Sequence, residues 1–356
     1  MKPINILLED DSVWPGYSFG ADTSTSGELV FNTGMVGYPE SLTDPSYRGQ
    51  ILMLTYPLIG NYGVPKRSNT ASGLDCNFES HQIQATGLVV SHYSERWNHW
   101  KGEKSLGDWL KEESIPGITG VDTRGLTRHL RTAGTMLAKI IVNEDPQWYQ
   151  PEDHHLVAEV SCTSPKIYGS GSKKVALIDC GVKNNIVREL LEQDLTVHVV
   201  PWDFPVHQHD FDGIFVSNGP GDPRHCQQTI DHLKISLQKK KPIFGICMGH
   251  QLLGMAAGAS VYKLKYGHRG QNQPVIEKGT NRALITSQNH GYTLDQHSLP
   301  PNWHCWYENL NDQTCAGIIH DSKIFRGVQF HPEATPGPTD SNYLFSTFRK
   351  LVEQCS

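Results

Sequence analysis

Two short segments of the chain carry side chains that can do chemistry together. The segment GICMGHQ contains Cys247, and the segment VQFHPE contains His331 and Glu333. A thiol nucleophile needs a base that takes its proton, and the base needs a group that orients its ring. These residue types therefore predict acyl transfer through Cys247. His331 is the expected base, and Glu333 is the carboxylate that holds the imidazole and favours its charged form.

The residues around Cys247 fit the turn that an exposed nucleophile needs. The pattern Gly245-x-Cys247-x-Gly249 is the thiol counterpart of the nucleophile elbow, in which small neighbours let a strand turn sharply into a helix. The dipole and unpaired N–H groups at a helix start favour a thiolate, and the N–H of Met248 can donate to an oxyanion. The pattern alone is weak, because a cysteine at such a junction is usually a small core residue. The HPE sequence is what favours catalysis.

A glycine-rich turn, SNGPGDP, follows the apolar run at residues 213–216. Gly219 and Gly221 allow the backbone to approach a ligand closely. This turn therefore predicts a second donor for an oxyanion, beside the one at Met248.

The elements that must position these segments alternate between strand and helix. Apolar, β-branched runs predict strands at residues 175–180, 195–200, 213–216 and 242–246, and helical spacing predicts helices at 184–192, after 223 to about 238, and at 248–257. This alternation predicts a doubly wound, mostly parallel α/β sheet. Ligands bind such sheets beyond the carboxyl ends of the strands, which is where SNGPGDP and GICMGHQ fall.

The chain divides near residues 161–174, SCTSPKIYGSGSKK, whose composition is typical of a linker. We therefore predict one domain at 1–160 and a second at 175–356, with a surface loop inside one domain as the alternative. The N-terminal half has the pattern of a β-rich α/β domain. In it, Asp122 is the expected N-cap of a basic helix. This half shows no chemistry of its own.

Composition excludes several classes of function. The formal net charge is −6 over 356 residues and there is no long Lys/Arg run, so we expect no nucleic-acid partner. No apolar run has the length of a membrane span, and the start lacks a signal-peptide pattern, so we expect no membrane association and a cytoplasmic location. The eight cysteines are scattered and expected to be reduced. His154/His155 and His207/His209 lack further ligands at zinc spacing, so no metal site is predicted.

Together, GICMGHQ, SNGPGDP and FHPE resemble the class I, or triad, glutamine amidotransferases, over about residues 175–352. The resemblance implies that Cys247 forms a γ-glutamyl thioester and that His331 and Glu333 complete the triad. It also implies that L-glutamine is bound by Gly219, Gly221, Met248, Gln251, Asn289, Gly291 and Tyr292. Tyr292 often has phenylalanine as its counterpart, so its hydroxyl is a mild departure. His250 and His290 lie within these motifs and are expected to be structural.

Residues 31–65 and 118–131 resemble the small, glutaminase subunits of carbamoyl-phosphate synthetase, so the resemblance covers nearly the whole chain. It implies that Ser46 reaches the glutamine site. It also implies that ammonia passes through a tunnel to a large subunit, which makes carbamoyl phosphate for arginine and pyrimidine synthesis. This chain has no G-x-x-x-x-G-K-[ST] loop. We expect no cofactor in it, and expect ATP, bicarbonate and Mg on the large subunit.

Three alternatives remain open. The first is a glutaminase that serves another acceptor, such as chorismate or a nucleotide, although this does not explain the N-terminal segments. The second is a subunit that keeps the fold and acts as a scaffold or allosteric anchor, which the intact Cys247, His331 and Glu333 argue against. The third is a cysteine protease, which would cleave peptides without an ATP-dependent partner.

Overall fold

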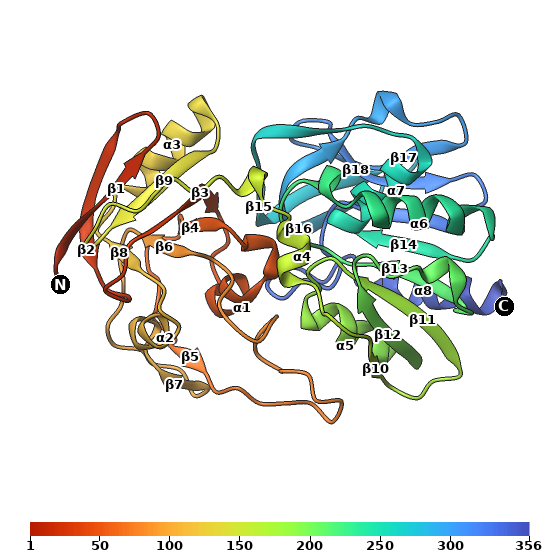
Figure 1. Cartoon of the computed structure of the whole chain (residues 1–356), viewed down its shortest axis with the longest axis horizontal. Coiled ribbons are helices and arrows are strands. Elements are labelled where there is room, and N and C mark those ends of the chain that lie inside the picture. Colours follow the sequence, from red (N-terminus) through yellow and green to blue (C-terminus); the bar gives the residue numbers. More distant parts are fainter. Residues whose placement is uncertain (356) are drawn as a thin grey trace. The chain divides into compact units, whose positions relative to one another are not determined.

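The computed structural model describes residues 1–355, which form a mixed α/β fold of two compact units, the first at Met1–His154 and the second beginning at His155 (Figure 1). Each unit has its own hydrophobic core. Within residues 1–355, none of the helices combines the length and the apolar character that crossing a membrane requires.

The first unit is built on a closed barrel of seven strands. In barrel order the strands are β1 (Pro3–Leu8), β2 (Val13–Ser18), β8 (Gly117–Thr119), β6 (Gly87–Val90), β4 (Gln50–Leu54), β3 (Thr25–Asn32) and β9 (Met136–Ile141), and β9 closes on β1. The β3, β4, β6 and β8 ladders are parallel and the others are antiparallel. Closure leaves no barrel strand with an unpaired edge.

Short elements surround this barrel. They are α1 (Tyr38–Thr43), η1 (Pro45–Tyr47), β5 (Val64–Pro65), β7 (Gly102–Lys104), α2 (Leu106–Glu112), α3 (Thr123–Ala133) and η2 (Pro151–Asp153). The predicted N-cap is present, since Asp122 Oδ1 accepts a hydrogen bond of 2.8 Å from the Gly125 N–H at the start of α3. Leu126 and Leu130, on one face of α3, are buried.

The second unit contains a ten-stranded mixed sheet. In sheet order the strands are β10 (Lys166–Tyr168), β12 (Leu195–Pro201), β11 (Lys173–Asp179), β13 (Gly213–Val216), β14 (Ile243–Ile246), β19 (Phe325–Val328), β18 (Cys315–His320), β17 (Trp303–Asn309), β15 (Val261–Glu277) and β16 (Ala283–Leu294). Strands β12, β11, β13, β14 and β19 run parallel. Strand β10 and the extension from β18 to β16 are antiparallel. The parallel part is where strands and helices alternate, as the sequence predicts.

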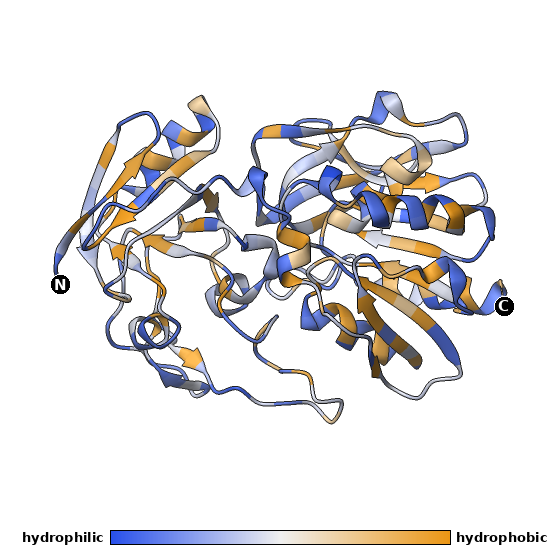
Figure 2. Ribbon diagram, in the orientation of Figure 1, coloured by the Kyte–Doolittle hydropathy of each residue, from blue (hydrophilic) through white to orange (hydrophobic). Residues whose placement is uncertain are grey.

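Helices cover both faces of the parallel part, as in a doubly wound sheet. The helical elements of this unit are α4 (Leu156–Val160), α5 (Asn184–Glu192), η3 (Val206–Gln208), η4 (Pro223–His225), α6 (Gln227–Gln238), α7 (Met248–Ala257), η5 (Gln296–Ser298) and α8 (Tyr343–Gln354). Apolar residues of α6 and α7 share one core with Ile178, Ile214 and Val216. On the other face, Phe348 of α8 packs against Phe215. Figure 2 shows apolar residues along the strands, while α6 is mixed.

The segment that composition marks as a linker has a structural role here. Along the chain, the division between the two compact units falls between His154 and His155. Residues 166–168, within the predicted linker, form β10, which pairs antiparallel with β12. A strand of three residues between proline, glycine and serine carries too short a pattern to be recognised from the sequence. The division into 1–160, 161–174 and 175–356 stays a prediction.

The packing of α8 predicts a large loss of stability when its central aromatic ring is removed. Phe348 is fully buried, with its ring centroid 5.1 Å from that of Phe215 and 6.2 Å from that of Phe244. We expect Phe348→Ala to lower the free energy of unfolding of the C-terminal unit by about 3 to 5 kcal/mol, because it leaves a cavity. Chemical denaturation measures this loss. Ile235→Ala, at a half-exposed position of α6, is the control and should change stability by less than about 1 kcal/mol.

Candidate active site

Cys247 stands alone between β14 and α7, in a backbone conformation that side chains rarely adopt. Its φ is 52° and its ψ −105°, and its N–H donates to the Val328 carbonyl at 2.8 Å. The flanking glycines make this turn possible: a Cβ on Gly245 would lie 2.3 Å from the Gly249 carbonyl oxygen, and a Cβ on Gly249 would lie 2.2 Å from that of Val216. The tight packing of α7 on the strand ends therefore holds the strained nucleophile in place.

His331 lies just beyond β19, the parallel neighbour of β14, so Cys247 and His331 follow adjacent strand ends. The His331 N–H donates to the Ser287 carbonyl at 2.9 Å, and the ring Nδ1 lies 2.7 Å from Glu333 Oε1. Its other ring nitrogen, Nε2, is buried without a hydrogen-bond partner among residues 1–355. An imidazole held by its Nδ1 in this way presents Nε2 for proton transfer.

A lysine that the sequence did not single out completes this buried group. Lys183, between β11 and α5, places its Nζ 3.0 Å from Glu333 Oε1 and donates to the Ala334 carbonyl at 2.6 Å. The side chains of Lys183, His331 and Glu333 are all at most 4% exposed. The sequence signal is only a lysine after a strand, which is more often a solvated side chain.

These charged groups shift one another's pKa values. Burial disfavours a charged Glu333, but Lys183 and then His331 outweigh it and lower the pKa of Glu333 to about 2. Burial also disfavours protonated His331, yet Glu333, followed by the Cys247 sulfur, raises the pKa of His331 to about 10. At neutral pH the site therefore contains an imidazolium next to the sulfur.

The glycine-rich turn lies beside the elbow. The Gly249 N–H donates to the Ser217 carbonyl at 2.9 Å, which joins the first turn of α7 to the start of SNGPGDP. Gly219 has no room for a side chain, since a Cβ would lie 2.0 Å from the Cys180 carbonyl oxygen, and Gly221 has a φ of +80°. Both glycines are therefore needed for the shape of this turn.

Strand β16 lies along the other side of the elbow. In its thiol form Cys247 donates from Sγ to the Asn289 carbonyl oxygen at 3.7 Å, and Gln251 Nε2 donates to the Tyr292 carbonyl at 2.7 Å. Gly291 lies between Asn289 and Tyr292 in β16. Among the predicted ligands, the structure thus places Asn289 against the Cys247 sulfur and joins Gln251, in the first turn of α7, to Tyr292. Ser46 belongs to η1 of the other unit, where its N–H donates to Asp44 Oδ1, and its assignment to the glutamine site stays a prediction.

Gln329 is a second residue of the site that the sequence did not reveal. It precedes His331 by two positions and is buried, and its Nε2 donates to Cys247 Sγ at 3.6 Å.

The two other histidines in the site motifs, His250 and His290, do not have the properties of a general base. Burial lowers the pKa of His250 to about 3 and lowers that of His290 well below its usual value.

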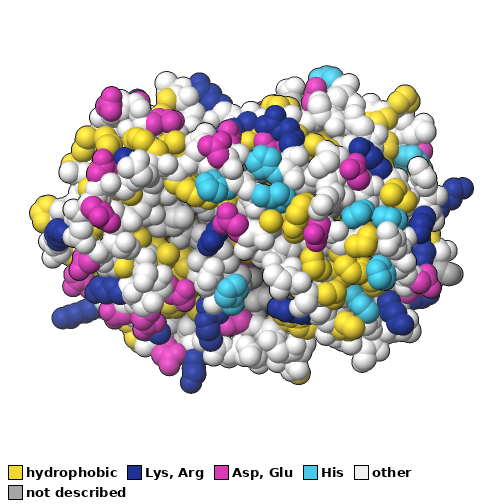
Figure 3. Space-filling view, viewed as in Figure 1, with side chains coloured by type: hydrophobic (Ala, Val, Ile, Leu, Met, Phe, Trp, Pro, Cys, Tyr) yellow, Lys and Arg dark blue, Asp and Glu magenta, His cyan; other side chains and the backbone are white. Residues whose placement is uncertain are grey.

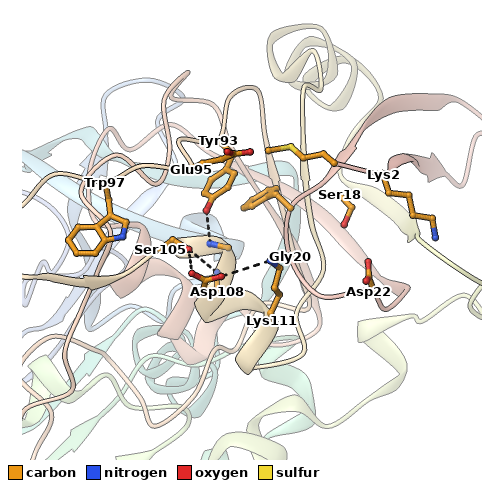
Figure 4. A pocket seen from close by; sticks show the side chains of 13 residues that line it. Lys2, Ser18, Gly20, Asp22, Tyr93, Glu95, Trp97, Ser105, Asp108 and Lys111 are labelled. Atoms are coloured by element: carbon orange, nitrogen blue, oxygen red, sulfur yellow. Dashed lines mark hydrogen bonds and ion pairs between the residues drawn. The ribbon is translucent and has the colours of Figure 1, made fainter.

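Elsewhere the described residues offer little alternative chemistry. No group of three or more His, Cys, Asp or Glu side chains within residues 1–355 could hold a metal ion. A pocket of about 660 Å³ in the N-terminal unit is lined by residues such as Lys2, Asp22, Tyr93, Asp108 and Lys111, none of them predicted site residues (Figure 4). On the face in Figure 3, acidic and basic side chains are interspersed, which does not resemble a nucleic-acid surface.

Comparison with known proteins agrees with this geometry. Residues 176–351 match the family model "Glutamine amidotransferase class-I", and residues 6–140 match "Carbamoyl-phosphate synthase small chain, CPSase domain". The arginine-specific small chain of carbamoyl phosphate synthase from Neosartorya fischeri is 50% identical, over 98% of this chain and 79% of that one. The multifunctional protein CAD of Squalus acanthias is 51% identical, over 96% of this chain and 16% of that protein.

A third relative is named differently. The mitochondrial carbamoyl-phosphate synthase [ammonia] of Mus musculus is 47% identical, over 99% of this chain and 24% of that protein.

The match to the family model shows that the second unit is a class-I glutamine amidotransferase domain. The whole chain belongs to the small chains of carbamoyl-phosphate synthase, the glutaminase subunits of that enzyme, and the resemblance identified in the sequence is confirmed.

The buried His331 predicts a pH dependence of stability. Because the folded protein holds the His331 proton more tightly than the unfolded chain does, the contribution of this residue is complete below pH 6.5 and is lost as the pH rises toward about 10. His331→Asn lacks this contribution. We expect the difference in free energy of unfolding between wild type and His331→Asn to shrink from pH 6.5 to 10, as measured by urea denaturation. A difference that is constant or grows over this range would contradict a raised pKa.

Proposed function

We propose that this chain hydrolyses L-glutamine to glutamate and ammonia through a thioester on Cys247. The observation that carries the proposal is the strained, buried Cys247 next to the charged series of His331, Glu333 and Lys183. A thiolate beside an imidazolium is nucleophilic at neutral pH, and a buried carboxylate keeps the imidazolium oriented.

In the first step the Cys247 sulfur attacks the side-chain carboxamide carbon of glutamine and a C–S bond forms. The N–H of Met248 and the turn at Gly219 and Gly221 are the proposed donors to the oxyanion of the tetrahedral intermediate. His331 Nε2 then gives its proton to the amide nitrogen. The C–N bond breaks, ammonia leaves, and a γ-glutamyl thioester remains.

In the second step His331, now neutral, takes a proton from water. The resulting hydroxide attacks the thioester carbon, the C–S bond breaks, and glutamate leaves as its γ-carboxyl group gives up its proton to solvent. Cys247 returns as the thiolate beside protonated His331, so the cycle is balanced. Glu333 and Lys183 keep the ring in one orientation during both proton transfers.

Gln251 is the proposed ligand of the amino-acid end of glutamine, and Asn289, Gly291, Tyr292 and Ser46 are proposed as further contacts of this substrate. The hydrogen bonds of Asn289 with Cys247 and of Gln251 with Tyr292 support this part of the proposal. Gly291 and Ser46 rest on the resemblance alone. The site needs no cofactor for this chemistry, because the nucleophile, the base and the oxyanion donors are all groups of this chain.

The proposed partner is the large chain of carbamoyl-phosphate synthase, which would receive the ammonia through a tunnel and use ATP, bicarbonate and Mg. Membership of the small-chain family supports the association. One relative is named as arginine-specific, so arginine synthesis is a proposed destination, and pyrimidine synthesis is proposed on the resemblance alone. A cytoplasmic location stays a prediction, since one relative is named as mitochondrial.

Similarity over the whole chain does not by itself establish glutamine as the nitrogen donor, because the mouse relative is named for ammonia. The residues of the site carry that part of the proposal. A scaffold that had lost catalysis would have no need of a strained cysteine or of a buried ion pair beside it.

Replacing the nucleophile separates the two nitrogen sources. In a complex of this chain with a large chain, we expect Cys247→Ser to lower glutamine-dependent carbamoyl phosphate synthesis by at least about 1,000-fold. Ammonia-dependent synthesis should stay within about twofold of wild type, because free ammonia bypasses Cys247. The measurement is carbamoyl phosphate formed from bicarbonate and ATP with each nitrogen source.

Three outcomes would contradict the proposal. Normal use of glutamine by Cys247→Ser would exclude Cys247 as the nucleophile. Glutamine hydrolysis by wild type that is fast and indifferent to the large chain would indicate a different acceptor. Absence of glutamine hydrolysis by wild type, alone and in the complex, would favour a scaffold.

A further inference from the structure

A series of hydrogen bonds connects a backbone carbonyl of β16 to the sulfur of Cys247. The Tyr292 carbonyl accepts from Gln251 Nε2 at 2.7 Å, and the same Nε2 donates to Gln329 Oε1 at 3.0 Å. Gln329 Nε2 in turn donates to Cys247 Sγ at 3.6 Å. The three residues that supply side chains are each at most 2% exposed, so water does not compete for these bonds.

The direction of this series is determined at its first member. A backbone carbonyl can only accept, so the amide nitrogen of Gln251, and not its oxygen, must face Tyr292. That nitrogen has a second hydrogen, which requires an oxygen on the facing end of Gln329. The amide of Gln329 is thereby oriented with its nitrogen toward the sulfur. The opposite orientation would place two N–H groups against each other and an oxygen against Cys247.

The chemistry of the sulfur benefits from this orientation. A thiolate is an acceptor, and a hydrogen bond to a charged acceptor is stronger than one to a neutral group. An N–H that points at Sγ therefore favours the thiolate and restricts the direction of its lone pairs. After the C–S bond has formed the sulfur is uncharged and gains less from the same donor, so Gln329 acts mainly on the attacking and leaving states.

We infer that Gln329 is a catalytic hydrogen-bond donor to the nucleophilic sulfur of Cys247, and that Gln251 is the positioning residue that fixes its orientation. The inference rests on the proposed glutaminase function and adds a residue to its site. Gln251 then has a role besides contact with glutamine, because both hydrogens of its amide are bound inside the protein.

Titratable groups on the elements that form the site set the background for a test by pH. His331 faces it from the segment after β19, with Glu333 and Lys183 behind the ring. His250 in α7 and His290 in β16 are held neutral by burial. None of these groups is changed when Gln329 is replaced, so a change in the pH profile reports the lost donor.

The test is the rate at which iodoacetamide alkylates Cys247, measured from pH 4 to 10 by mass spectrometry of the peptide that contains it. We expect Gln329→Met to move the pH of half-maximal rate upward by about one unit, and to lower kcat for glutamine about tenfold with a smaller effect on KM. Gln329→Glu should move the profile further, because a carboxylate then faces the thiolate. Gln251→Met should give a smaller shift in the same direction, since it frees the Gln329 amide to rotate.

Gln84→Met is the matched control. Gln84 is a buried glutamine of the other unit whose amide donates to Ser80 Oγ at 3.0 Å, so its replacement should leave the profile unchanged. Unchanged profiles in folded Gln329→Met and Gln329→Glu would overturn the inference. If circular dichroism shows that both fail to fold, Gln251→Met decides, and no shift in it would overturn the inference too.

The readout also separates the two proposals. Alkylation is measured without glutamine, so it reports on Gln329 even if wild type fails to hydrolyse glutamine. A wild type that hydrolyses glutamine through Cys247, combined with an unchanged profile in the variants, would leave the proposed function standing and reject the role of Gln329.

Discussion

The catalytic unit depends on the close contact between the first turn of α7 and the ends of β13 and β14. Gly245 and Gly249 permit this contact, and Cys247 between them has a positive φ of 52°. Everything else in the site is arranged around the sulfur that this turn presents. Packing, and not hydrogen bonding to the thiol alone, therefore determines where the nucleophile stands.

Two hydrogen-bonded series of groups, which come from different elements, surround Cys247. A charged series from Lys183 through Glu333 to His331 sets the protonation of the base. A neutral series from the Tyr292 carbonyl through Gln251 to Gln329 reaches the sulfur itself. Because the residues lie just before α5, on α7, on β16 and in the segment after β19, the site exists only when the whole sheet has formed. Local stability of any one helix does not create it.

The sequence was sufficient for residues whose neighbours along the chain reveal their function. Cys247 between two glycines, and His331 two positions before Glu333, are patterns within a few residues, and the alternation of apolar runs predicted the parallel strands. Lys183 and Gln329 are different, because their partners are distant in sequence: Lys183 lies 150 positions from Glu333, and Gln329 lies 82 from Cys247. Contacts of this kind depend on tertiary packing, which a single sequence does not display. The same holds for the antiparallel extension from β18 to β16 and for closure of the N-terminal barrel.

The short strand β10 has a consequence for solubility. It is an edge strand of the ten-stranded sheet, and the unpaired backbone groups of an edge strand can pair with a strand of another molecule. Three residues, with Pro165 immediately before them and Gly169 in a left-handed conformation after them, form a border too short to serve as a template for such pairing. The segment whose composition is typical of a linker thus covers part of the edge of β12 and offers little backbone for pairing with another molecule.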